Sequence, residues 1–77
     1  MFDVNGLLDD AVKETDNLET GEIFLVKDLF KGYVWNRIAL KDRLLLGTLF
    51  LNHVSKTGGS IQAIEKTSSG QQRYKKI

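Results

Sequence analysis

The sequence predicts one α+β domain with the element order helix, strand, helix, helix, strand, strand. Two long segments, over residues 2–18 and 40–55, repeat apolar residues at three- and four-residue spacing, which is typical of amphipathic helices. Two short segments near the end of the chain flank a polar, glycine-containing link, which is typical of a β-hairpin. A chain of 77 residues supports one thin core, so these elements belong to a single domain.

The first predicted helix covers Phe2–Leu18. Asp3 or Asn5 can cap its start, and Thr20-Gly21 follows its end. Its spaced apolar residues are Val4, Leu7, Leu8, Ala11, Val12 and Leu18.

The middle of the chain predicts shorter elements. Glu22–Val26 is a short apolar run typical of a buried strand, and Lys27–Lys31 predicts one or two helical turns that Gly32 stops. Tyr33–Ile38 is interpreted as a bulky connector, with Trp35 expected in the core.

The second long helix is predicted over Leu40–Ser55 and ends at Thr57-Gly58-Gly59. Leu44 and Leu51 lie on the arc opposite its apolar stripe, so we expect a partner subunit, the hairpin or bases to cover them. Only Asn52 on that arc could make a bidentate contact with adenine. This helix is therefore expected to read duplex sequence poorly. The apolar stripe itself comprises Leu45, Leu46, Leu49, Phe50, His53 and Val54.

Ser60–Lys66 and Gln71–Ile77 are the two predicted strands, joined by Thr67–Gly70. The complete order is that of a winged helix-turn-helix. In this interpretation residues 1–18 form an acidic helix, residues 22–57 form the strand and the helix-turn-helix, and residues 60–77 form the β-hairpin wing of one domain spanning 1–77.

The net charge of +1 conceals a strong separation of charge along the sequence. Residues 1–20 carry six acidic residues and one lysine, whereas residues 21–77 carry ten Lys/Arg and four acidic residues. Two interpretations remain open: the basic part binds a polyanion, or acidic and basic elements face each other in the fold.

Cations and aromatic residues are interleaved in the basic part. Cations bind phosphates, and aromatic rings stack on unpaired bases, for which Tyr33 or Tyr74 are the candidates. The candidate nucleic-acid-binding residues are Lys31, Tyr33, Arg37, Lys41, Arg43, Lys66, Arg73, Tyr74, Lys75 and Lys76.

The sequence offers no recognisable catalytic or metal-binding constellation. It has no cysteine and a single histidine, His53, which is interpreted as structural. We therefore expect no enzyme activity and no cofactor. The N-terminus lacks a signal-peptide pattern and no apolar run is long enough for a membrane span, so we expect a cytoplasmic protein without a membrane partner.

Residues 22–77 also carry a family resemblance. Lys27–Phe30, Trp35, Arg43–Phe50 and a hairpin ending in Tyr74 form its pattern. In these motifs the chain resembles the small winged-helix single-stranded DNA-binding proteins of staphylococcal cassette chromosome mobile elements, which were formerly a domain of unknown function. The resemblance implies binding to single-stranded DNA in support of element replication, beside a helicase or polymerase, and it assigns no DNA-contacting residue.

Three function hypotheses follow. The first is a non-enzymatic single-stranded DNA-binding protein, and the second is a double-stranded DNA-binding transcription regulator. The third is a protein–protein adaptor that uses an exposed strip of Leu44 and Leu51. A homo-oligomer is compatible with all three.

Overall fold

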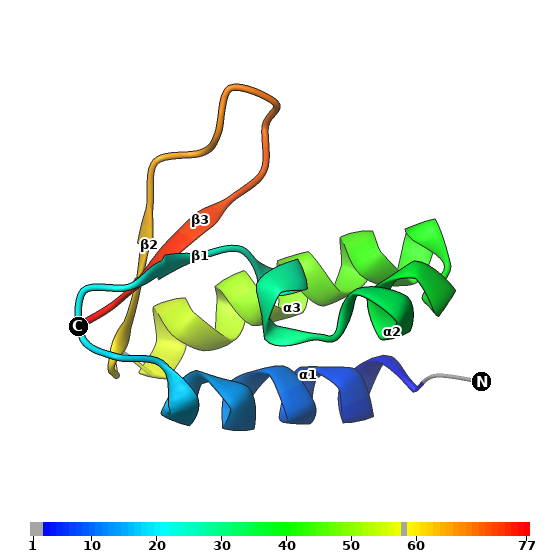
Figure 1. Cartoon of the computed structure of the whole chain (residues 1–77), viewed down its shortest axis with the longest axis horizontal. Helices are drawn as coiled ribbons and strands as arrows, with labels where there is room; N and C mark the ends of the chain where they lie inside the picture. Colours follow the sequence, from blue (N-terminus) through cyan, green and yellow to red (C-terminus); the bar gives the residue numbers. More distant parts are fainter. Residues whose placement is uncertain (1–2, 58) are drawn as a thin grey trace.

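A computed structural model of the protein describes residues 3–57 and 59–77. These residues form three α-helices, two short 3-10 helices and a three-stranded antiparallel sheet, so the α+β prediction is confirmed (Figure 1). The helix α1 (Val4–Glu14) packs along α3 (Leu40–Thr57), and α3 packs against the strand β2 (Ile61–Ile64). The hairpin loop between β2 and β3 (Arg73–Lys76) extends beyond the helices (Figure 1).

The helix α1 covers Val4–Glu14 and continues into the 3-10 helix η1 over Thr15–Asn17. The Asp3 carboxylate accepts a hydrogen bond from the Asn5 N–H at 3.3 Å, so Asp3 is the N-cap. The predicted helix over Phe2–Leu18 is thus confirmed in its centre, and Phe2 lies outside the described residues. Leu7 and Ala11 are buried in the core.

The prediction for the middle of the chain is wrong in detail. The strand β1 is only Ile23–Phe24. The helical turns predicted over Lys27–Lys31 are present in part, as the 3-10 helix η2 over Val26–Leu29, where the Asp28 carboxylate accepts the Leu25 N–H at 2.9 Å. This local bond favours a tight turn over a continued strand.

The second α-helix, α2, covers Gly32–Arg37. Gly32 therefore begins a helix, whereas the sequence predicted that it ends one. Trp35 packs on Phe30, with the ring centroids 5.8 Å apart. This contact stabilises a helix in the segment that the sequence predicts to be a connector. The packing of a large aromatic side chain outweighs the cost of a glycine at the first helical position.

The third helix, α3, covers Leu40–Thr57, two residues beyond the predicted end. The predicted breaker Gly58 lies outside the described residues. Leu46, Phe50 and Val54 are buried at four-residue spacing. Leu44 is 66% exposed, as expected, but Leu51 is partly buried against the core, so the prediction of an exposed Leu44/Leu51 strip is wrong for Leu51.

The reason for this shift lies in the neighbours of α3. Both α1 and β2 pack against it, so the buried face is rotated from the stripe that the sequence periodicity indicates. Leu45, placed in the core stripe by periodicity, is 48% exposed.

The sheet has the strand order β1-β3-β2 with all pairs antiparallel. The strands β2 (Ile61–Ile64) and β3 (Arg73–Lys76) form the predicted hairpin, shorter at both strands than expected. The connecting residues 65–72 are held by a Thr67 N–H to Gln71 carbonyl bond of 2.8 Å and by Gly70 at φ +88°. That positive φ favours glycine, so Gly70 sets the shape of the loop.

The core lies where the sheet meets α1 and α3. Tyr74 stacks on Phe24 at 5.7 Å between ring centroids and meets the edge of Phe50 at 4.9 Å. These three rings join the central strand to α3, so the position of the hairpin relative to α3 is fixed by aromatic packing.

Candidate nucleic-acid interface

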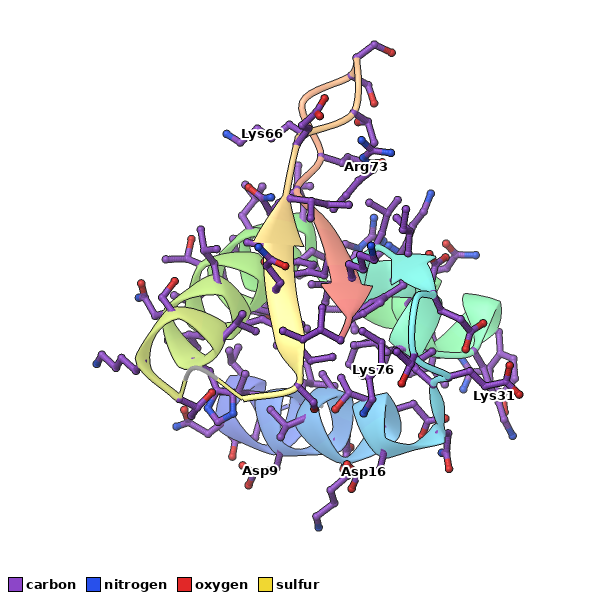
Figure 2. The ribbon with its side chains drawn as sticks, turned by 90° about the vertical axis from the view of Figure 1, so that its left-hand side faces the viewer. Asp9, Asp16, Lys31, Lys66, Arg73 and Lys76 are labelled. Carbon is purple, nitrogen blue, oxygen red and sulfur yellow. The ribbon has the colours of Figure 1, made fainter. Side chains whose placement is uncertain are left out.

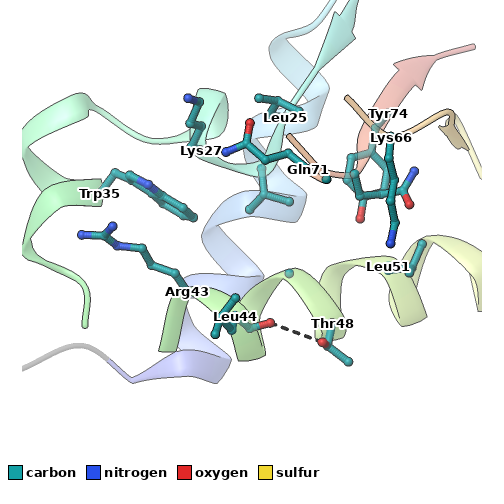
Figure 3. A pocket seen from close by; sticks show the side chains of 14 residues that line it. Leu25, Lys27, Trp35, Arg43, Leu44, Thr48, Leu51, Lys66, Gln71 and Tyr74 are labelled. Carbon is teal, nitrogen blue, oxygen red and sulfur yellow. Dashed lines mark hydrogen bonds between the residues drawn. The ribbon is translucent and has the colours of Figure 1, made fainter. Parts of the chain in front are cut away.

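A groove of about 410 Å³ lies between the hairpin, η2, α2 and α3 (Figure 3). Its floor and walls include Leu25, Trp35, Leu44 and Leu51, which give it apolar surface. Polar groups from α3 and the hairpin join them: Thr48, Gln71, Gln72 and Tyr74.

The electrostatics of the groove are one-sided. Lys27, Arg43 and Lys66 line it from three separate segments, and none of its lining residues is acidic. A concave site lined by one sign of charge concentrates counter-ions, and cations of this kind bind phosphates. The groove therefore suits an anionic ligand that also presents apolar faces.

Arg43 is held in place at the groove by the turn between α2 and α3. Its Nε donates to the Ile38 carbonyl at 2.9 Å, and its Nη2 donates to the Asn36 carbonyl at 3.3 Å. Its guanidinium carbon lies 5.6 Å from the centroid of the Trp35 ring. This cation–π contact orients the indole at the groove wall.

Trp35 packs against the core, as the sequence predicts, but it is only partly buried. It contacts the Phe30 ring and also lines the groove beside Arg43. An aromatic face beside a cation is the combination that stacks on unpaired bases. Periodicity could not reveal this role, because a six-residue helix is too short to display a face in sequence.

The structure brings only part of the predicted set into the groove. Arg43, Lys66 and Tyr74 line it, while Lys41 lies exposed in the first turn of α3 outside the lining. Lys27 and Gln71, which were not among the predicted binding residues, also line it. Lys27 could have been identified as a candidate binding residue because it is a basic residue in the short turn after β1.

The prediction that Tyr74 stacks on bases is wrong. The residue is 1% exposed, because Phe24 stacks on its ring and Phe50 packs edge-on to it. Burial raises the pKa of the Tyr74 phenol to about 12. Tyr74 is therefore a core residue whose ring is closed to a ligand, although it lines the groove at one edge.

Lys76 is likewise not available for the predicted phosphate contact. Its Nζ donates to the Thr15 carbonyl at 2.9 Å and lies 3.4 Å from Ser60 Oγ. This places the ammonium at the C-terminal end of α1 (Figure 2), where helix carbonyls lack partners and a cation is stabilising. Lys76 thus ties β3 to the first helix.

Arg73 and Lys75 alternate with Tyr74 and Lys76 along β3, so they lie on the opposite side of the sheet. Arg73 Nε donates to the Glu65 carbonyl at 2.9 Å, which helps to hold the hairpin loop. Lys75 is exposed between its register partners Gln62 and Ile23. Neither residue lines the groove.

Lys31, Tyr33 and Arg37 form a separate cluster on α2. Tyr33 is 55% exposed, and its ring centroid lies 5.1 Å from the Arg37 guanidinium carbon and 6.0 Å from Lys31 Nζ. Tyr33 and Arg37 are one helical turn apart, whereas Trp35 lies about 200° from Tyr33 around the helix axis. This cluster therefore faces away from the groove.

Among known families, a model described as "Domain of unknown function (DUF1413)" matches residues 9–76. The chain belongs to the DUF1413 family. The match extends from within α1 to the last residue of β3, so it includes every segment that lines the groove. No curated protein and no solved structure matches the chain.

The acidic helix of this DUF1413 domain lies away from the groove. Asp9 and Asp16 lie on the opposite side of the molecule from Lys66 and Arg73 of the hairpin (Figure 2). No α1 residue lines the groove, and the acidic side chains of residues 3–19 are exposed. The acidic residues of α1 and η1 thus lie apart from the cations of the hairpin loop, and α1 does not cover the basic groove.

Within residues 3–57 and 59–77, no three His, Asp or Glu side chains gather in an arrangement that could hold a metal ion. In the same residues no helix combines the length and apolar character needed to cross a membrane. His53 is partly buried and lines a smaller hollow of about 240 Å³ beside α1.

Proposed function

We propose that this protein binds single-stranded DNA in the groove between the hairpin and α3 and catalyses no reaction. In this proposal the fold is a winged helix-turn-helix, with α2 and α3 as the helix pair and the β2–β3 hairpin as the wing. The observation that carries the proposal is the lining of the groove: three cations, no acidic residue, and an apolar surface with a Trp35 face beside Arg43.

The apolar part of the lining favours a single strand over a duplex. A duplex presents phosphates and polar groove edges, whereas an unpaired strand also presents base faces. Leu25, Leu44 and Leu51 cannot form hydrogen bonds with polar base edges, but their apolar side chains can pack on base faces. The exposed part of α3 is poorly suited to recognise a duplex sequence, because it carries leucines where a recognition helix carries Arg, Asn or Gln.

The resemblance to winged-helix proteins of cassette chromosome elements agrees with this proposal. It adds a biological context, replication of a mobile element beside a helicase or polymerase in the cytoplasm, which is part of the proposal.

The test is fluorescence anisotropy with matched single- and double-stranded oligonucleotides at two salt concentrations. We expect tighter binding to the single strand. Neutralisation of phosphates by the three groove cations predicts a log–log salt slope of about −2 for a single strand, or about 20-fold weaker binding at 200 mM than at 50 mM salt. Tighter duplex binding, or affinity that is independent of salt, contradicts the proposal.

A second candidate is a protein–protein adaptor. Leu40, Leu44 and Leu45 are exposed at 67, 66 and 48% on the first half of α3, and exposed apolar groups of this kind mark protein contacts. Leu40→Glu combined with Leu45→Glu changes no groove residue. Loss of self-association or partner capture in this variant, with DNA affinity retained, supports the adaptor.

A further inference from the structure

Tyr74 has a polar atom for which the fold provides no partner. Tyr74 as a whole, hydroxyl included, is 1% exposed, and the hydrogen bonds of the described residues include none to its hydroxyl. No fully enclosed side-chain oxygen or nitrogen in residues 3–57 and 59–77 lacks a partner, so this hydroxyl meets solvent. The hollow that Tyr74 lines is the groove, into which Figure 3 shows the hydroxyl pointing.

This arrangement makes the hydroxyl a hydrogen-bond donor inside the groove. Burial raises the pKa of Tyr74 to about 12, so the phenol stays protonated at neutral pH. Lys66, which lines the same groove, carries an ammonium that only donates. Two donors without a neighbouring carboxylate are complementary to carbonyl oxygens of a ligand.

The bases of a single strand differ in what they offer such donors. Thymine presents carbonyl oxygens at O2 and O4, whereas adenine presents an amino group and ring nitrogens. A carbonyl oxygen has two lone pairs and can accept from Tyr74 and Lys66 together, whereas each adenine ring nitrogen has one lone pair and accepts one hydrogen bond. The adenine amino group is itself a donor, which the Lys66 ammonium cannot accept. A strand of thymines therefore satisfies the groove better than a strand of adenines.

We propose that the Tyr74 hydroxyl donates a hydrogen bond to a base carbonyl of the bound strand and so gives the groove a preference for thymine over adenine. This inference rests on the proposed function and adds a specificity-determining residue to it. Tyr74 then has two separate roles, since its ring holds the core and its hydroxyl contacts the ligand.

The test compares the wild-type protein with Tyr74→Phe, using labelled oligo-dT and oligo-dA of equal length in anisotropy titrations. The wild-type protein should bind oligo-dT more tightly. Tyr74→Phe should weaken oligo-dT binding about 2- to 12-fold, the range of one net hydrogen bond, and leave oligo-dA binding unchanged. Its melting temperature should match the wild type, because no protein group bonds to the hydroxyl. Lys66→Met should also lower the preference for oligo-dT.

Ser55→Ala is the control, because it removes a hydroxyl from α3 outside the groove. Equal binding of oligo-dT by the wild type and Tyr74→Phe overturns the inference while leaving the proposed function intact. A marked loss of stability in Tyr74→Phe also overturns it, by showing that the hydroxyl serves the fold. Failure of the wild-type protein to bind either strand overturns the proposed function itself.

Discussion

Arg43→Lys is expected to weaken the fold although it keeps the charge. The Arg43 side chain bonds to the carbonyls of Ile38 and Asn36 across the α2–α3 turn and lies over Trp35. Lysine lacks the planar fork and cannot make these contacts together. A bond from a charged donor contributes about 1.5 to 3 kcal/mol and a partly exposed cation–π contact about 0.5 to 1 kcal/mol. Because lysine recovers part of this, the expected loss is about 2 kcal/mol.

Thermal unfolding followed by circular dichroism measures this loss. For a domain of this size, 2 kcal/mol corresponds to a melting temperature about 8 to 16 °C lower. Arg37→Lys is the matched control, because Arg37 is exposed and its guanidinium lies over the Tyr33 ring, so its substitution should cost less than about 1 kcal/mol. If Arg43→Lys melts no lower than Arg37→Lys, the turn does not depend on the guanidinium.

Two substitutions at Arg43 separate its role in the fold from the contribution of its charge to DNA binding. Arg43→Lys retains a groove cation and should keep the salt slope of single-strand binding, measured where the variant is folded. Arg43→Gln removes that cation and should make the slope shallower by about 0.7. A wild-type slope in Arg43→Gln would contradict the assignment of Arg43 to the groove.

Three further predictions concern stability and the shape of the groove. Lys76→Met should lower the free energy of unfolding by about 1 to 3 kcal/mol, because the Thr15 carbonyl loses its charged donor; an unchanged urea midpoint refutes this. Gly47→Ala should raise the free energy of unfolding by about 1 kcal/mol, since an added Cβ meets no atom within 4 Å. The same Cβ is added to the lining of the groove, so single-strand binding should weaken, and unchanged or tighter binding would contradict this. The pKa of Tyr74 in the folded protein lies above its unfolded value of 10.0. Its contribution to the free energy of unfolding is therefore complete below pH 10 and declines, by up to about 3 kcal/mol, as the pH rises towards 12. Urea unfolding at pH 8 and pH 11 should show this decline in the wild type relative to Tyr74→Phe, and equal declines in both proteins would refute it.

Several elements were predictable because their signals are local. The three- and four-residue spacing of apolar residues along α1 and α3 indicates helices with one side in the core, and the buried residues Leu46, Phe50 and Val54 belong to the predicted stripe of α3. Asp3 caps α1, and the polar link containing Gly70 closes the hairpin, through bonds between near neighbours in sequence. Such interactions need only a few consecutive residues.

The short elements and several site residues were not predictable in this way. The helical state of Gly32–Arg37 depends on Trp35 packing on Phe30 and on Arg43 of the following helix. The fate of Leu51 depends on elements that meet α3 from two directions. Lys76 and Tyr74 look like other residues of a basic strand until the fold places one against α1 and the other among Phe24 and Phe50.

Residue spacing and composition were enough to predict the α+β class, the two long helices, the hairpin and the unequal charge of the two parts of the chain. These properties do not require knowledge of distant contacts. Which cations share a groove depends on the fold, because Lys27, Arg43 and Lys66 come from segments far apart in the chain. The fold also buries the Tyr74 ring and points its hydroxyl towards that groove (Figure 3), since burial is set by how the sheet packs on α3.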